Sequence, residues 1–394
     1  MPSQFLRDFG FEKLIRPIAP DAFFDTYWER KPLLVDRGAT RFYGDLLSAA
    51  DLETALTAAG DSFGLARNTE DGAYAVEYAG SAAEVSELTI TGLRGGDSLV
   101  LLDAQDRLSN LGLMCRLLAR EFGYQVHSKV FLTPAGCKAF KPHYDRYDAF
   151  ILQVLGSKSW RVEKYRRKFP RPEEYDRGET EMSRYREAFR LDQGDFLYIP
   201  RGYVHAAESD DAVSMHITLT VEPPTWEDLL HAVVKRGADR EERFKHALPV
   251  GFLSEPPDRL AAGLVILTAA LAAPAHLDDV AGRFADEYVT RFAPDIAGHV
   301  AAFVAGDRPA PEDMAGPRRG LVYRLRDEDE AVVLLVGSRR IAFPDLLAEQ
   351  LRFALETPSF AVRDLPGDLT NDEKIVFIER LVQEGLVERK DPVA

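Results

Sequence analysis

A histidine and an aspartate lie two residues apart in the segment Lys141–Phe150, as His143 and Asp145. In an extended chain, side chains two residues apart point to the same side, so these two project together while Tyr144 points elsewhere. An imidazole and a carboxylate on one face are two of the three ligands of a facial metal triad. The pair therefore predicts part of a metal site with open coordination positions.

A third ligand is expected from the segment Gly194–His205. There a predicted strand ends at Pro200, a glycine turn follows, and His205 begins the next stretch. Two imidazoles and one carboxylate suit non-haem Fe(II), because a bidentate cosubstrate and O2 can bind side by side in the open positions. A His-x-Asp pair by itself is a weak signal. The distal motif strengthens the assignment of His143, Asp145 and His205 as metal ligands and catalytic residues.

Lys158 is a candidate partner for a cosubstrate. 2-Oxoglutarate chelates iron through its 2-oxo acid end and presents its far carboxylate to a cation. Lys158 follows His143 by 15 residues, one predicted strand and one turn onward. A solvated lysine in a turn is the alternative, and spacing by itself does not separate the two interpretations.

These residues belong to a β-rich block over residues 126–220. Short runs rich in Val, Ile, Phe and Tyr, separated by Gly, Pro and charged loops, predict strands and a barrel or double-sheet jelly roll. The expected strands are Lys129–Thr133, Ala149–Leu155, Ser159–Glu163, Asp195–Ile199 and Val213–Val221. The mixed-charge stretch Lys164–Arg190 between them is expected to be an exposed insertion.

Residues 1–125 have a mixed pattern. It predicts helices at Asp21–Arg30, with Asp21 as N-cap, at Ala49–Ala59 and at Leu108–Phe122, and a short strand at Pro32–Val35.

Pro223-Pro224 interrupts the β pattern. A helical region is expected from Trp226 to about Val304, and a linker at 306–311. The remaining residues predict a strand pair, two helices and a short strand, an order similar to a winged helix: Leu321–Leu325, Ala331–Val336, Pro344–Glu356, Asn371–Glu384 and Leu386–Glu388. We therefore expect an α+β chain with domains at 1–224, 225–306 and 312–394.

Charge and composition narrow the function classes. The formal net charge of −15 argues against general nucleic-acid binding, and residues 311–394 hold 12 Lys and Arg against 17 Asp and Glu, whereas a DNA-reading winged helix is normally basic. No apolar run has the length of a membrane span, and the first residues do not resemble a signal peptide. Two cysteines, Cys115 and Cys137, fit a reducing compartment, so a cytoplasmic location is expected.

The core motifs resemble those of the Jumonji-C (cupin-4) ribosomal oxygenases. The resemblance lies in His143–Val162, Ile199–Glu208 and Ser214–Thr220, and Phe244–Phe252 is similar to the helical dimerisation region of that family. It implies a double-stranded β-helix (jelly-roll or cupin) catalytic domain that uses Fe(II), 2-oxoglutarate and O2. It also implies a helical dimerisation domain, and hence a homodimer, and a winged-helix-like C-terminal domain.

The resemblance also implies individual roles. The family positions for the metal match His143, Asp145 and His205, and the position for the far carboxylate of 2-oxoglutarate matches Lys158. Further residues of the cosubstrate pocket are expected to be His216, which matches a histidine near the iron, Lys129, where some members carry Asn, and Thr133 and Tyr124. A satisfied histidine on an inner barrel face is the alternative for His216.

The implied activity is hydroxylation of a histidine or arginine side chain of a ribosomal protein, with release of succinate and CO2. Three alternatives stay open from the sequence. The same chemistry can act on a peptide or small molecule, a non-catalytic cupin can hold a metal as a scaffold, and the C-terminal tail can belong to a transcription factor, although its negative charge argues against this last class.

Overall fold

The computed structural model describes residues 3–58, 62–68, 74–138, 140–171, 174, 182, 187–254, 256–306 and 308–390. The chain forms two compact units, residues 1–223 and 224–394. The first unit has nearly the bounds predicted for the catalytic domain. The regions predicted as separate helical and C-terminal domains both lie in the second unit.

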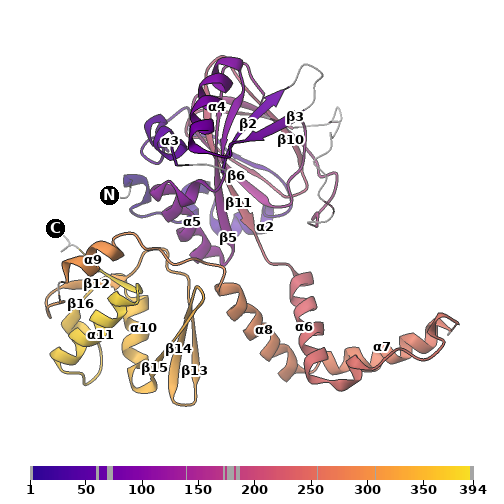
Figure 1. The fold of residues 1–394 in the computed structure, drawn as a ribbon, viewed down its shortest axis with the longest axis vertical. Coiled ribbons are helices and arrows are strands. Elements are labelled where there is room, and N and C mark those ends of the chain that lie inside the picture. The colour runs from indigo at the N-terminus through magenta and orange to yellow at the C-terminus, as the bar shows by residue number, and fades with distance from the viewer. Residues whose placement is uncertain are drawn as a thin grey trace. The chain divides into compact units, whose positions relative to one another are not determined.

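Two antiparallel sheets form the first unit (Figure 1). The larger has the order β1-β9-β6-β11-β5-β4-β2-β3, and the smaller has the order β10-β7-β8. The strands are β1 Leu33–Val35, β2 Phe63–Asn68, β3 Tyr74–Tyr78, β4 Ser98–Leu101, β5 Gln125–Thr133, β6 Asp148–Leu155, β7 Lys158–Glu163, β8 Glu187–Leu191, β9 Phe196–Ile199, β10 Val204–Ser209 and β11 Ser214–Glu222.

The inner faces of the two sheets pack together over an apolar cluster. Ile151 of β6 and Leu197 of β9 come from the larger sheet, while Trp160 of β7 and Leu191 of β8 come from the smaller one. Alternation along each strand places these residues inside and sends their neighbours to the outer faces. This arrangement confirms the predicted double-sheet cupin fold.

Helices accompany the sheets of this unit: η1 Gln4–Leu6, α1 Phe11–Ile15, α2 Pro20–Thr26, α3 Ala49–Leu56, α4 Ala82–Gly95, η3 Ala104–Asp106 and α5 Ser109–Phe122. The outer face of β6 is covered by aromatic residues, since Phe150 packs against Phe11 and Phe23 at ring distances of 5.4 and 6.2 Å. The N-terminal helices therefore support the strand that follows the predicted metal ligands.

The predicted N-cap at Asp21 is wrong. Helix α2 begins at Pro20, after Ala19, and ends at Thr26 rather than at Arg30. Proline suits the first turn because its fixed φ matches the helix and its missing N–H would have no partner there. The prediction also missed the helices α1 and α4 and the strands β2, β3, β4 and β10.

The stretch Lys164–Arg190 is not wholly an insertion. Its last residues belong to β8, whose Arg190 pairs with Ser159 of β7. Residues 172, 173, 175–181 and 183–186 lie outside the described part of the chain. The barrel therefore extends further along this segment than its mixed charge suggested.

The second unit begins with helices: α6 Trp226–Arg240, η5 Glu242–Lys245, η6 Phe252–Ser254, α7 Pro257–Leu271, α8 Pro274–Val289 and α9 His299–Ala305. Ion pairs join α6 and α8, Arg236 with Glu287 and Arg240 with Asp279. Among the described helices, none is by itself both long and apolar enough to cross a membrane; α7 and α8, bent by 69° at their junction, meet the criteria only as a pair, by length and composition.

The C-terminal part has two three-stranded sheets and two helices around one apolar core. Its elements are β12 Met314–Pro317, β13 Arg324–Glu328, β14 Ala331–Val336, β15 Arg339–Pro344, η7 Asp345–Leu347, α10 Ala348–Glu356, β16 Phe360–Ala361, η8 Val362–Asp364, α11 Asn371–Gln383 and β17 Val387–Lys390. The predicted strand at 321–325 starts instead at Arg324, because Leu321 ends a turn and packs into the core. The winged-helix likeness stays a prediction.

Candidate metal centre

His143, Asp145 and His205 lie together near the start of β10. One ligand atom from each lies within 4.8 Å of the others. A β-bridge between the two histidines brings them together: the His143 N–H donates to the His205 carbonyl at 3.1 Å, and the His205 N–H donates to the His143 carbonyl at 2.7 Å. His205 is the second residue of β10, while the other two residues precede β6. A further backbone hydrogen bond, from the Gly202 N–H to the Asp145 carbonyl at 2.8 Å, ties Asp145 to the same turn, so long-range backbone contacts assemble the predicted triad.

Backbone carbonyls fix the orientation of both imidazoles. Nδ1 of His143 lies 2.8 Å from the carbonyl oxygen of Lys141, and Nδ1 of His205 lies 3.1 Å from that of Tyr203. A carbonyl can only accept, so these contacts require the ring proton on Nδ1 and leave Nε2 for a metal. Nε2 of His205 lies 3.5 Å from Oδ2 of Asp145.

The charges of the triad are those that a divalent cation needs. Burial lowers the pKa of His205 to about 4, with His143 adding to this effect, so the imidazole of His205 is neutral at pH 7. Burial raises the pKa of Asp145, but the nearby His143, His205 and Lys129 outweigh burial and hold that pKa below its ordinary value. A neutral imidazole and an ionised carboxylate are the ligand forms that bind metal.

Lys158 lies inside the barrel rather than in a solvated turn. Its side chain is buried, and its Nζ donates to Oγ1 of Thr133 at 2.9 Å. Thr133 also accepts a hydrogen bond from Ser98 at 3.1 Å. Burial lowers the pKa of Lys158 to about 7. A buried ammonium is costly without an anion beside it, so this position fits a carboxylate ligand.

Two buried polar atoms near Lys158 also fit a polar ligand. Within the part of the chain that the structure describes, Nδ1 of His216 and Nε1 of Trp160 have no hydrogen-bond partner. Their rings are 5.5 Å apart, and the ring of Trp160 lies 6.1 Å from that of His205. Buried polar groups normally have partners, so a ligand between Lys158 and the triad would complete this pocket. These residues fit iron and 2-oxoglutarate by position and chemistry.

The remaining predicted pocket residues divide into two groups. Nζ of Lys129 donates to the hydroxyl of Tyr147 at 2.6 Å, and Lys129 acts on the charge of Asp145, so Lys129 belongs to this site. The structure does not bring Tyr124 there. Tyr124 precedes β5, at the end opposite Thr133, and its ring stacks on Trp28 at 6.4 Å.

Trp160 and Tyr147 are site residues that the sequence interpretation missed. Trp160 lies two residues after Lys158 on β7 and therefore shares its inner face. Tyr147 hydrogen-bonds to Asp145, which it follows by two residues. Both stand in the motif that carried the resemblance, and the period of two would have indicated Trp160.

Comparison with known proteins relates the part of the chain that holds this metal site to a known domain family. The family model described as JmjC domain matches residues 101–229. The chain is 33% identical over 310 residues to human ribosomal oxygenase 1, and 30% identical over 260 residues to the bifunctional lysine-specific demethylase and histidyl-hydroxylase NO66 of Caenorhabditis elegans. The matches cover 71% and 62% of this chain and 47% and 34% of those proteins, so the chain spans at most about half the length of these relatives.

Solved structures show the same fold. YcfD of Escherichia coli matches with a TM-score of 0.61 and 18% identity, covering 95% of this chain and 98% of that one. A structure of the E. coli ribosomal oxygenase YcfD in complex with cobalt and 2-oxoglutarate matches with a TM-score of 0.57, 17% identity, and coverage of 95% and 99%. At these identities the likeness establishes the fold of this chain.

Proposed function

Since residues 101–229 of this chain form a JmjC domain, we propose that the protein is an Fe(II)- and 2-oxoglutarate-dependent oxygenase that hydroxylates a protein side chain. The observation that carries the proposal is the grouping of His143, Asp145 and His205 within 4.8 Å, with both imidazoles oriented by backbone carbonyls. Three protein ligands leave room for a bidentate cosubstrate and O2.

We also propose a cytoplasmic location.

The bound iron and O2 supply the oxidising chemistry, in which a substrate C–H and 2-oxoglutarate become C–OH, succinate and CO2. The residues of the chain bind and orient. Lys158 holds the far carboxylate of 2-oxoglutarate by charge, and Thr133 fixes the direction of its ammonium. Trp160 and His216 close the inner wall and offer polar atoms to the cosubstrate. The apolar cluster behind them excludes water from that end of the pocket.

We propose a ribosomal protein as the substrate and one of its histidine or arginine side chains as the target. The relatives named ribosomal oxygenase support this class. The net charge of −15 would attract a basic protein over long range, and most ribosomal proteins are basic. The same charge makes direct nucleic-acid binding unfavourable.

The test is mass spectrometry of ribosomal proteins from cells with the gene, without it, and with a His143→Ala allele. One added oxygen on a histidine or arginine, lost in both altered strains, is the expected result. If the spectra agree in all three strains, the ribosomal substrate is wrong. Succinate formation by the purified protein without substrate then decides whether the oxygenase assignment itself stands.

We further propose that the protein is a homodimer formed through its helical region. Three consecutive apolar residues of α7 are largely exposed: Leu264 (61%), Val265 (67%) and Ile266 (58%). Helix α7 has no buried residue in the single chain. An apolar surface of this kind is expected at an interface between copies.

A further inference from the structure

Lys158 and the metal ligand His205 are fixed in one two-stranded ladder. Lys158 is the first residue of β7 and pairs with Ser209, the last residue of β10, while His205 pairs with Val162. Each strand residue advances about 3.3 Å, so the four steps from His205 to Ser209 place the two functional positions about 13 Å apart along the ladder. The register of β7 against β10 therefore sets the distance between the metal and the lysine.

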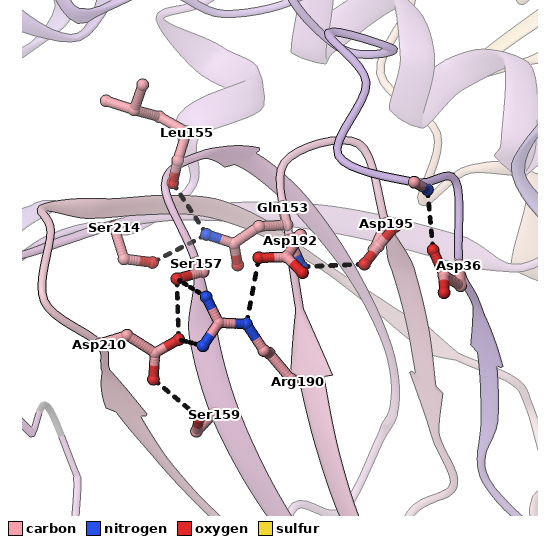
Figure 2. Close-up of polar contacts among 11 residues, drawn as sticks. Asp36, Gln153, Leu155, Ser157, Ser159, Arg190, Asp192, Asp195, Asp210 and Ser214 are labelled. Atoms are coloured by element: carbon pink, nitrogen blue, oxygen red, sulfur yellow. Dashed lines mark hydrogen bonds and ion pairs between the residues drawn. The ribbon is translucent and has the colours of Figure 1, made fainter.

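Asp210 follows β10 directly and holds the lysine end of this ladder. Its Oδ2 accepts a hydrogen bond from Oγ of Ser157 at 2.8 Å, and its Oδ1 accepts one from Oγ of Ser159, also at 2.8 Å (Figure 2). One carboxylate thus binds both sequence neighbours of Lys158. The Asp210 side chain is 19% exposed, so water competes little for these contacts.

Arg190 of β8 adds to the cluster from the third strand of the small sheet. Its Nη1 lies 2.9 Å from Oδ2 of Asp210, and its Nη2 donates to Oγ of Ser157 at 3.2 Å (Figure 2). The Arg190 side chain is 60% exposed, and exposed ion pairs contribute little. The carbonyl of Asp210 accepts from the Gly136 N–H at 2.8 Å, which anchors the chain after β10. The two serine contacts are therefore the main link between Asp210 and Lys158.

We propose that Asp210 is a positioning residue that locks β7 against β10 and so sets the length of the dicarboxylate that fits between the metal and Lys158. This rests on the proposed function, because the distance matters only if a dicarboxylate spans it. Lys158 points inward while Ser157 and Ser159 point outward, so Asp210 fixes the lysine without touching the ligand. A rigid spacing selects 2-oxoglutarate over 2-oxoadipate, which is one methylene longer.

The test uses the full chain loaded with Mn²⁺ under anaerobic conditions. Titration calorimetry measures the affinity of this loaded chain for 2-oxoglutarate and for 2-oxoadipate, and the affinity of the metal-free chain for Mn²⁺. The variants are Asp210→Ala and the double variant Ser157→Ala/Ser159→Ala, which removes the same two contacts from the other side. Asp211→Ala, at the exposed neighbouring aspartate, is the matched control.

In both variants we expect 2-oxoglutarate affinity to fall about tenfold, at the lower end of the roughly 10–100-fold loss seen when the supporting partner of a metal ligand is removed. Affinity for 2-oxoadipate should change much less, so the selectivity between the two acids narrows. Mn²⁺ affinity and the control should match the wild type. If Asp210→Ala does not fold, the double variant decides by itself.

Two outcomes overturn the inference without touching the proposed function. One is that both variants keep the wild-type selectivity between the two acids while the wild-type protein binds 2-oxoglutarate. The other is a parallel loss of Mn²⁺ and 2-oxoglutarate affinity, which would make Asp210 a support of the fold only. A wild-type protein that binds Mn²⁺ but neither acid would instead refute the proposed function, and the inference would fall with it.

Discussion

At the scale of single residues, the site depends on polar side chains that each have a hydrogen-bond partner. His143 and His205 are oriented by carbonyls two residues before each of them. The ammonium of Lys158 donates a hydrogen bond to Thr133, and its position in the barrel suits the binding of an anion. Burying such polar side chains costs free energy, and the fold by itself does not require it. Their burial therefore indicates a role in binding and chemistry.

Replacing His143 by Ala removes one of three protein ligands. We expect Mn²⁺ affinity to fall by more than about 100-fold, beyond the usual loss for a residue that only supports a ligand, and turnover to disappear. The measurement is calorimetric titration with Mn²⁺ alongside succinate formation. His231→Ala, an exposed histidine on α6, is the control, and near-normal metal binding by His143→Ala would refute the iron assignment.

Lys158 predicts a pH dependence of stability. Its pKa is about 7 in the folded protein and 10.5 ordinarily, so between these pH values the unfolded chain binds a proton that the folded chain does not. The destabilisation from Lys158 is thus fully present below pH 7 and is relieved as the pH rises from 7 towards 10.5. In urea unfolding of the metal-free protein, Lys158→Met should be more stable than the wild type at pH 6.

This advantage of Lys158→Met in the free energy of unfolding should shrink steadily between pH 7 and pH 9.5. The wild type and Lys158→Met are compared at each pH. The contributions of the other titrating groups to the free energy of unfolding therefore largely cancel. A difference independent of pH would mean that the Lys158 ammonium is not desolvated in the folded state.

At the scale of elements, tight turns fix the strands that carry the site. Gly156 links β6 to β7 with φ of +64°, and a Cβ there would lie 2.1 Å from the carbonyl oxygen of Val213. Gly136 has a similar φ of +67°, but a Cβ there would meet nothing within 4 Å. Comparing alanine substitutions at the two glycines therefore separates two costs in stability: that of the left-handed backbone conformation and that of the close contact with Val213.

We expect Gly156→Ala to destabilise the protein by about 2–4 kcal/mol, since a left-handed alanine costs about 1–2 kcal/mol and the contact with Val213 adds to it. Gly136→Ala should cost only the first part. Urea unfolding at pH 7 measures both. Equal effects at the two positions would show that the β6–β7 turn can relax and does not hold Lys158 rigidly.

At the scale of the whole molecule, the proposed dimer depends on the apolar surface of α7. A charge at Val265 would be buried without a partner in that interface. We expect light scattering to give twice 44.0 kDa for the wild type and 44.0 kDa for Val265→Glu. The control is Ile90→Glu on α4, where Ile90 is 70% exposed in the first unit, and it should remain dimeric. A wild-type monomer would refute the dimer.

The sequence by itself determined the residue types and their local order. Short runs rich in Val, Ile, Phe and Tyr, bounded by Gly, Pro and charged loops, predicted β5, β6, β7, β9 and β11. Strands β2, β3 and β4 were missed, and their place in the larger sheet is given by long-range pairing, such as that of β4 with β5. The spacing of His143 and Asp145 predicted a shared face, and the distal motif predicted His205.

Only the tertiary structure decided which distant residues meet. The bridge between His143 and His205 joins them, the pairing of β7 with β10 sets Lys158 against His205, and the placement of Tyr124 beside Trp28 removes it from the pocket. The alternation of apolar and polar residues does not fix the register between two strands. Shifting one strand by two residues leaves the same side chains on the inner face, so the sequence pattern fits both registers equally well. Packing and side-chain contacts such as those of Asp210 select one register, and with it the geometry of the site.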